Sequence, residues 1–279
     1  MTNYLAAIQM DCIVGDIKQN TTQAIRLLEN LLEKEPDIVL AVFPEMALYG
    51  YGRLDELRQN NTQNAIDFAL QEIATVCIHK HIAVVIGAPY FKEDCVENAL
   101  YYISENGAIW HVYSKVHLIE AEQPYFQAGK TYCICETPIG KLGFLICWDS
   151  AFCEPARLYA KAGIDLLVVS AAWESPYERQ WELAVCGRSF DNSLPMIASN
   201  RVGTDESFTF FGNSVIADCM GNSCTKDIGN QESFVFADVD EVLDTKKRNG
   251  FGSQIDELQD ETYQLKHIQY LDKERGTDR

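Results

Sequence analysis

Basic residues are scarce in this sequence. Lys and Arg number 23 against 41 Asp and Glu in 279 residues, which gives a formal net charge of −18. The densest basic run is short and covers residues 246–248. A strongly acidic surface repels phosphate backbones and anionic lipid headgroups. We therefore expect neither nucleic acid nor a membrane surface as a partner.

Long apolar runs are also missing. No segment has the roughly 18 to 20 consecutive apolar residues that a membrane-spanning helix requires. Residues 1–16 contain no basic region, and Gln9 and Asp11 interrupt their apolar stretch, which argues against a signal peptide. The sequence thus favours a cytoplasmic protein.

Regularly spaced metal or disulfide motifs are absent as well. The 10 cysteines are irregularly spaced, and a chain of this size can bury a core without covalent staples, so we expect free thiols in a reducing compartment. Cys77, His79 and His81 lie close together, but no second group follows at the spacing of zinc ligands. Neither a metal site nor a cofactor is therefore expected.

What the sequence does contain is an alternation of strand-like and helix-like segments. The apolar run 37–43 is typical of a buried strand, and residues 19–33 place apolar side chains on one face of a helix that Asn20 or Thr21 could cap. This alternation predicts layered α/β packing in one domain over residues 1–279, ending in an acid-rich tail from about residue 250. The other expected strands are 4–10, 82–87, two within 98–110, 141–146, 165–170, 195–200, 213–218 and 233–239, and the other expected helices are 62–80, 154–162 and 177–192.

Three reactive polar residues follow strand-like runs directly, namely Glu45, Lys115 and Cys147. In open α/β sheets ligands bind beyond the carboxyl ends of strands, so we expect these side chains to converge there. Each residue alone has a plainer interpretation: a structural glutamate at a turn, a surface lysine and an inert core cysteine. As a set, however, they are chemically complementary.

Their complementarity is that of an activated thiol. The pKa of a free thiol is about 8.5, so Cys147 needs a base, and a carboxylate such as Glu45 supplies one. Lys115 would lower the pKa of the thiol and stabilise a developing oxyanion. The start of the helix after Cys147 adds backbone N–H donors and the positive end of a helix dipole.

The segments around these residues carry a recognisable pattern. In chain order, FPEMALYGY, YSKVHL and CWDSAFCEPAR resemble the three signature motifs of the nitrilase, or carbon–nitrogen hydrolase, superfamily. The resemblance extends to NRVG at 200–203, FFGNSVIAD at 210–218 and VDEVLDTKKRN near the end, so it covers nearly the whole chain. It implies an α/β fold, the four-layer α-β-β-α sandwich of the nitrilase type, assembled as a homodimer or higher homo-oligomer.

Carried over to matching positions, the resemblance implies hydrolysis of a small amide by a Glu-Lys-Cys triad, without a cofactor. Cys147 would be the nucleophile, Glu45 the general base and then acid, and Lys115 the oxyanion stabiliser. The backbone N–H of Trp148 would complete the oxyanion hole. His117 would be structural.

Two further positions follow from the resemblance. A second active-site glutamate of the family matches Glu122 in EQPYFQAG, and Glu120 competes for that role. Cys153 departs from the family pattern, in which proline is commoner at this position. A packed structural cysteine is favoured there over a second reactive thiol.

The sequence leaves the choice of substrate open. Members of the family cleave nitriles, simple amides, ω-amides of dicarboxylic acids and N-carbamoyl compounds. Asp149, after Trp148, favours an amide or N-carbamoyl substrate over a nitrile. Members that bind N-carbamoyl amino acids often carry arginines where this chain has Ser150 and Ala151, so that clamp for a carboxylate is absent. Glu174 would select an amine-bearing substrate, such as an N-carbamoyl amine, unless it is only a solvated turn residue. The expected pocket residues are Tyr49, Trp148, Trp173 and Glu174, with Tyr125 and Phe126 as further apolar walls.

Two other classes of protein remain as alternatives. A papain-type protease needs a Cys–His pair, but His117 precedes Cys147, and no histidine follows it before His267. A nitrilase-like scaffold or binding module would not need to retain all three reactive residues. The sequence therefore favours the enzyme over both.

Overall fold

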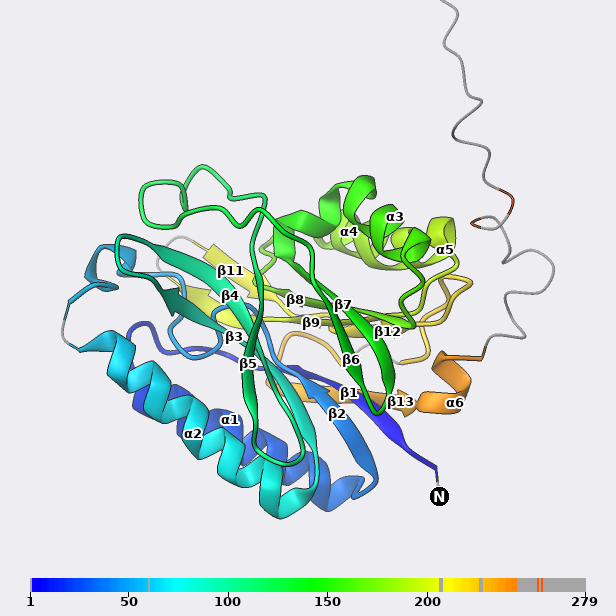
Figure 1. Cartoon of the computed structure of the whole chain (residues 1–279), viewed down its shortest axis with the longest axis horizontal. Helices are drawn as coiled ribbons and strands as arrows, with labels where there is room; N and C mark the ends of the chain where they lie inside the picture. The colour runs from blue at the N-terminus through cyan, green and yellow to red at the C-terminus, as the bar shows by residue number, and fades with distance from the viewer. Residues whose placement is uncertain are drawn as a thin grey trace, which may run out of the picture.

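The computed structural model describes residues 2–59, 61–205, 208–225 and 228–244, together with 255 and 257. Two β-sheets lie face to face, and each is covered on its outer side by helices, as Figure 1 shows. This arrangement confirms the expected four-layer α-β-β-α sandwich. The acid-rich tail expected from about residue 250 lies outside the described residues except at 255 and 257.

The first sheet is mixed, with its parallel strands at the centre. Its spatial order is β13 (Ser233–Asp238), β1 (Tyr4–Gln9), β2 (Ile38–Val42), β3 (Ala83–Phe91), β4 (Val96–Ile103) and β5 (Ile109–Ser114). β1, β2 and β3 run parallel, and the other neighbours pair antiparallel. The pair β4–β5 is the hairpin expected within residues 98–110, with both strands longer than expected.

The second sheet is also parallel at its centre. Its spatial order is β12 (Val215–Ala217), β9 (Met196–Asn200), β8 (Leu166–Ala171), β7 (Gly140–Ile146) and β6 (Ile134–Thr137). β7, β8 and β9 run parallel, whereas both edge strands are antiparallel to their neighbours. A separate hairpin joins β10 (Val202–Asp205) to β11 (Phe208–Phe211).

Helices form the two outer layers. α1 (Ile17–Lys34) and α2 (Thr62–Lys80) cover the first sheet, and α3 (Cys153–Lys161), α4 (Glu178–Glu182) and α5 (Arg188–Asn192) cover the second (Figure 1). A π-helical stretch at Leu183–Gly187 joins α4 to α5, so the expected helix at 177–192 is one continuous helical segment. Short helices are present at Leu54–Glu56, Cys147–Ala151 and α6 (Val239–Val242). In the described part of the chain, no helix has the length and apolar character needed to cross a membrane.

The central strands are apolar throughout because both of their faces are covered. In β1, Ala6 and Ile8 belong to the core beneath α1 and α2, whereas Leu5 and Ala7 belong to the core between the sheets. Successive side chains of a strand point to opposite faces, so a strand between two layers reads as a continuous apolar run. The same reasoning identified β2 and β8 from the sequence.

The start of α1 differs from the expectation. Asp16 is the N-cap, and its carboxylate accepts a hydrogen bond from the backbone N–H of Gln19 at 3.0 Å. Asn20, expected as a cap, lies inside the helix, buried, and its side chain bonds the main chain of Ile13 and Leu48. Its polar group therefore joins a loop to the helix, a role that only the packing of distant segments reveals.

Candidate active site

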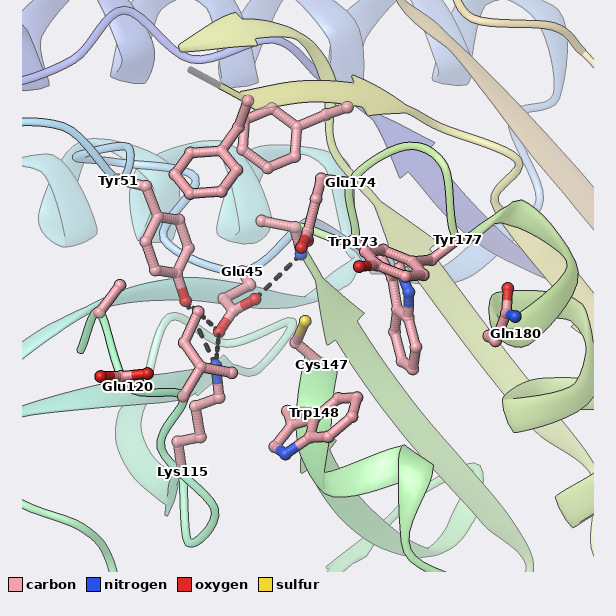
Figure 2. A pocket seen from close by; sticks show the side chains of 15 residues that line it. Glu45, Tyr51, Lys115, Glu120, Cys147, Trp148, Trp173, Glu174, Tyr177 and Gln180 are labelled. Atoms are coloured by element: carbon pink, nitrogen blue, oxygen red, sulfur yellow. Dashed lines mark hydrogen bonds and ion pairs between the residues drawn. The ribbon is translucent and has the colours of Figure 1, made fainter. Parts of the chain in front are cut away.

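A cavity of about 500 Å³ opens where strands from both sheets end. Residues that follow β2, β5, β7 and β8 line it, and Figure 2 shows their side chains pointing toward one another. The structure thus brings Glu45, Lys115 and Cys147 to one cavity, as expected from the carboxyl-end rule. Trp148, Trp173, Glu174 and Glu120 also line it.

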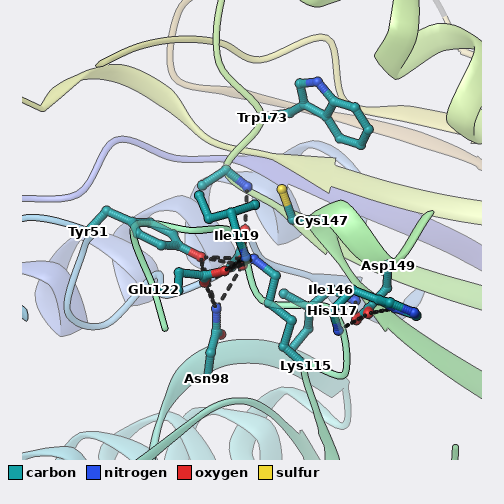
Figure 3. A network of polar contacts seen from close by, with 12 residues as sticks. Tyr51, Asn98, Lys115, His117, Ile119, Glu122, Ile146, Cys147, Asp149 and Trp173 are labelled. Atoms are coloured by element: carbon teal, nitrogen blue, oxygen red, sulfur yellow. Dashed lines mark hydrogen bonds and ion pairs between the residues drawn. The ribbon is translucent and has the colours of Figure 1, made fainter. Parts of the chain in front are cut away.

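Lys115 lies between two carboxylates at the bottom of the cavity. Its Nζ is 2.8 Å from Glu45 Oε1 (Figure 2) and 2.8 Å from Glu122 Oε2 (Figure 3). Its side chain is 1% exposed, and the side chains of both glutamates are fully buried. A buried ammonium is stable only when it is paired and hydrogen-bonded, and these two carboxylates meet that requirement.

Tyr51 and Asn98 complete this buried cluster. The Tyr51 hydroxyl is within hydrogen-bonding distance of both glutamates, at 2.7 Å from Glu122 Oε1 and closer to Glu45 Oε1. Asn98 Nδ2 donates to Glu45 Oε1 at 2.8 Å. It also donates to Glu122 Oε1 at 2.9 Å (Figure 3). Tyr51 is the tyrosine of the GY pair in the first motif, whereas nothing in the sequence singled out Asn98.

Glu45 is placed by a close approach between its turn and β3. A Cβ on Gly87 would come within 2.5 Å of Met46 N and 2.6 Å of Pro44 O. Only glycine lets the backbone of residues 44–46 lie this close to the strand. The second carboxylate oxygen of Glu45, Oε2, accepts the backbone N–H of Ala172 at 2.9 Å.

Cys147 lies at a sharp turn between β7 and a short 3-10 helix. Its φ is +45°, a left-handed conformation that is unfavourable for a residue with a side chain. The turn directs the sulfur into the cavity (Figure 2). The backbone N–H of Ala172, which donates to Glu45 Oε2, also opposes the rise in the pKa of the Cys147 thiol that burial causes.

The buried carboxylate of Asp149 stabilises the strained turn at Cys147. It is fully buried and accepts the Ile146 N–H at 3.2 Å, the Tyr113 hydroxyl at 2.9 Å and the His117 N–H at 2.8 Å. His117 Nδ1 lies 2.7 Å from the same carboxylate, and His117 is not among the residues that line the cavity. This position agrees with the expectation that His117 is structural.

The electrostatics of the cluster favour a neutral thiol beside a permanent cation. Burial raises the pKa of Cys147 well above its ordinary value of 9.0, and Glu45 adds to the rise while Lys115 opposes it. Burial likewise raises the pKa of Glu45, and Lys115 opposes this rise. Burial alone would lower the pKa of Lys115, but Glu45 and Glu122 outweigh it and raise that pKa, so Lys115 stays charged.

The opening of the cavity is aromatic. Trp148 is 41% exposed, and its ring centroid lies 6.0 Å from that of the buried Trp173. Tyr177, Phe208 and Phe210 continue this lining. Lys115 is the only lysine or arginine among the described residues that line the cavity, and the two carboxylates already engage it.

The two candidate second glutamates occupy different positions. Glu122 is fully buried and contacts Lys115, and its Oε2 also accepts the Ile119 N–H at 2.9 Å. Glu120 lines the cavity from an exposed position. The geometry therefore places Glu122, and not Glu120, in the buried cluster.

Three expected pocket residues do not line the cavity. Tyr49 is packed in the core under α1 and α2, and its hydroxyl donates to the Arg53 carbonyl at 2.8 Å. Tyr125 and Phe126 lie at a separate depression that does not include Cys147. The first motif does place a tyrosine in the cavity, but it is Tyr51, which directly follows Gly50 at a φ of +82°.

No group of three or more His, Cys, Asp or Glu residues is arranged to hold a metal ion in the parts of the chain that the structure describes. Cys77 is buried in α2, while His79 and His81 are exposed near the end of that helix.

Comparison with known proteins agrees with this architecture. A sequence model described as "Carbon-nitrogen hydrolase" matches residues 4–248. The chain is 38% identical over 219 residues to the probable nitrilase C965.09 of Schizosaccharomyces pombe, covering 77% of this chain and 80% of the relative. It is 26% identical over 277 residues to the N-carbamoylputrescine amidase of Arabidopsis thaliana, covering 89% and 90%.

A solved structure shares the fold. The carbon–nitrogen hydrolase from Helicobacter pylori G27 superposes with a TM-score of 0.83 at 24% identity, over 94% of this chain and 97% of that protein. The fold is thus that of the nitrilase-type hydrolases. The chain belongs to the carbon–nitrogen hydrolase family, whose members act on carbon–nitrogen bonds.

Proposed function

We propose that this protein hydrolyses a small non-peptide amide through a thioester on Cys147. The observation that carries the proposal is that Glu45, Lys115 and Cys147 line one cavity, where the buried Lys115 ammonium lies 2.8 Å from the Glu45 carboxylate. Nucleophile, base and oxyanion stabiliser are the three groups that acyl transfer to a thiol requires. The whole described chain from β1 to α6 is assigned to this one catalytic domain.

In the proposed first step, Glu45 takes the thiol proton as the sulfur attacks the amide carbonyl. Oε1 of Glu45 already accepts from Lys115, Asn98 and Tyr51, whereas Oε2 accepts from Ala172. We therefore assign Oε2 as the oxygen that receives the proton. The raised pKa of Glu45 makes it a stronger base than an exposed carboxylate, which favours transfer.

The tetrahedral oxyanion would then be stabilised by Lys115 and by the backbone N–H of Trp148. Glu45 returns its proton to the leaving nitrogen, and the C–N bond breaks to give a thioester and ammonia or an amine. The same carboxylate next activates a water molecule, which hydrolyses the thioester and regenerates the thiol. Glu122 is assigned to hold Lys115 in place, because its fully buried carboxylate lies 2.8 Å from the ammonium.

The cavity supports a neutral or cationic substrate rather than an anionic one. No lysine or arginine among its described lining residues is free to bind a carboxylate, whereas Glu174 lies at the aromatic opening. A carboxylate among aromatic rings is a suitable environment for an ammonium group. This observation favours an N-carbamoyl amine as the second candidate substrate, in line with the similarity to N-carbamoylputrescine amidase. Nitriles are a third candidate, without a specific feature of the cavity to favour them.

The protein is further proposed to act as a cytoplasmic homodimer or higher homo-oligomer. Leu158 on α3 is 52% exposed and Leu183 is 50% exposed, both in the outer helical layer of the second sheet. Two exposed leucines do not by themselves mark an interface, so the expectation of an oligomer comes from the resemblance to the nitrilase family. Light scattering on the purified protein should therefore give at least twice the 31.5 kDa mass of the chain.

The decisive experiment is an ammonia-release assay over simple amides, N-carbamoyl amines and nitriles. We expect turnover in at least one class and none with Cys147→Ala. Cys153→Ala is the matched control, because this exposed thiol is six residues further on and does not line the cavity. Hydrolysis that survives in Cys147→Ala would refute the proposal. A folded wild-type protein without activity on any class would favour the scaffold alternative.

A further inference from the structure

A buried arginine lies just beyond the cavity. Arg201, at the end of β9, is fully buried, and its guanidinium donates to Asp205 Oδ2 at 3.0 Å and to the Cys12 carbonyl at 2.9 Å. The guanidinium also lies 4.4 Å from the ring centroid of Phe210, a cavity residue. A buried guanidinium is destabilising unless it is paired and hydrogen-bonded, so the fold requires these contacts of Arg201.

Asp205 connects this arginine to the loop that carries Tyr51. Its Oδ2 also accepts the backbone N–H of Tyr51 at 3.2 Å and that of Gly52 at 3.0 Å. The loop lies so close that a Cβ on Gly52 would be 2.9 Å from Asp205 Oδ1 and 2.8 Å from Val14 Cγ1. The carboxylate thus fixes the main chain of Tyr51 directly.

The other end of Tyr51 reaches the proposed base. Its hydroxyl lies within hydrogen-bonding distance of Glu45 and Glu122, while neither Arg201 nor Asp205 lines the cavity. We propose that Arg201 and Asp205 form a positioning pair, which sets the Tyr51 hydroxyl against Glu45 and thereby tunes the base. This inference rests on the proposed function of Glu45, and the pair is not assigned any contact with substrate.

The expected consequence follows from the direction of the hydrogen bond. Burial raises the pKa of Glu45, and the hydrogen bond that Tyr51 donates works against this rise. If Tyr51 moves away, the carboxylate loses a donor and its pKa rises further. The base then stays protonated to a higher pH, so the acid limb of the kcat/KM profile should move upward.

A double-mutant cycle tests the pair. We expect Tyr51→Phe and Asp205→Ala each to lower kcat about tenfold and to move the acid limb upward by about half a pH unit, as loss of one hydrogen bond to the base predicts. Because both act through one hydroxyl, the double variant should resemble the Tyr51→Phe single variant. Asp191→Ala is the matched control. It removes a carboxylate that lies 2.8 Å from Arg188, and neither residue lines the cavity.

Gly52→Ala provides a second test that leaves both charges in place. The added methyl group would collide with the Asp205 carboxylate, so the same upward shift of the acid limb is expected without loss of the ion pair. Thermal unfolding of each variant separates displacement of Tyr51 from a loss of folded protein. If Asp205→Ala does not fold, Gly52→Ala with and without Tyr51→Phe completes the same cycle.

Two results would overturn the inference. The first is a double variant in which the effects multiply, and the second is a lower kcat with an unmoved acid limb. Failure of the proposed function itself is recognised separately, by turnover that survives in Cys147→Ala. The rate at which iodoacetamide labels Cys147, measured against pH, reports the titration of Glu45 without a substrate. The variants should shift this labelling profile upward in pH as well.

Discussion

The bottom and the opening of the cavity are built on opposite principles. The bottom is the buried cluster of Glu45, Lys115 and Glu122, in which every charge has several hydrogen bonds and almost no exposure to solvent. The opening is apolar, with Trp148 41% and Tyr177 47% exposed (Figure 2). Under the proposed function, the buried cluster would determine the type of reaction, and the aromatic opening would determine which molecule reaches it.

This contrast teaches why the two parts differ in tolerance to change. Removing one member of the buried cluster leaves an unpaired charge in a site without solvent, which is expensive. Replacing an aromatic residue at the opening removes only some buried apolar area, because solvent already reaches the side chain, so the loss of stability is small. Substitutions at the bottom should therefore abolish activity, and those at the opening should alter substrate preference.

The largest effect is expected for Lys115→Met. This variant removes the proposed oxyanion donor and leaves Glu45 and Glu122 facing each other without a cation. We expect kcat to fall by about a thousandfold or more and the free energy of unfolding to fall by about 3–5 kcal/mol. Kinetics on the best substrate and chemical denaturation measure the two effects. Lys130→Met, at an exposed position, is the control, and a Lys115→Met variant with near-normal kcat would remove the basis of the comparison.

A smaller effect is expected from pH. Burial raises the pKa of Glu45 above its ordinary value of 4.5, so the base is protonated below this raised pKa and the rate is lost as pH falls through it. Below the midpoint kcat/KM should drop about tenfold per pH unit, as for one essential base. No alkaline loss from Lys115 is expected up to its ordinary value of 10.5, because its pKa is raised. A pH–rate profile with its acid midpoint at or below 4.5 would contradict a buried base.

The smallest effect is expected for Glu174→Gln at the opening. The variant keeps size and hydrogen bonding but loses the charge, so we expect KM for amine-bearing substrates to rise about two- to fivefold, as for loss of a partly solvated ion pair. Neutral amides should be unaffected. Glu120→Gln is the matched control from the exposed rim. Equal changes for charged and neutral substrates would show that Glu174 does not choose between them.

Most of the fold, and the three central residues of the site, could be predicted from the sequence. Apolar runs located β2 and β8, and three motifs singled out Glu45, Lys115 and Cys147, which the structure brings to one cavity. Their catalytic roles stay predictions. The sequence did not indicate Asn98, because an asparagine in a strand has no distinctive spacing. It also did not indicate Asp16, which caps α1 in place of the expected Asn20 or Thr21.

By itself the amino-acid sequence determined the layers, since alternation of apolar residues follows from the geometry of strands and helices, and it determined which reactive groups the chain possesses. Only the tertiary structure decided that Tyr51 and not Tyr49 faces those groups, that Glu122 and not Glu120 is buried against Lys115, and that Arg201 reaches the same loop through Asp205. The physical reason is that burial, pairing and pKa depend on atoms brought together from distant segments. A local pattern contains no information about which of two neighbouring side chains will meet them.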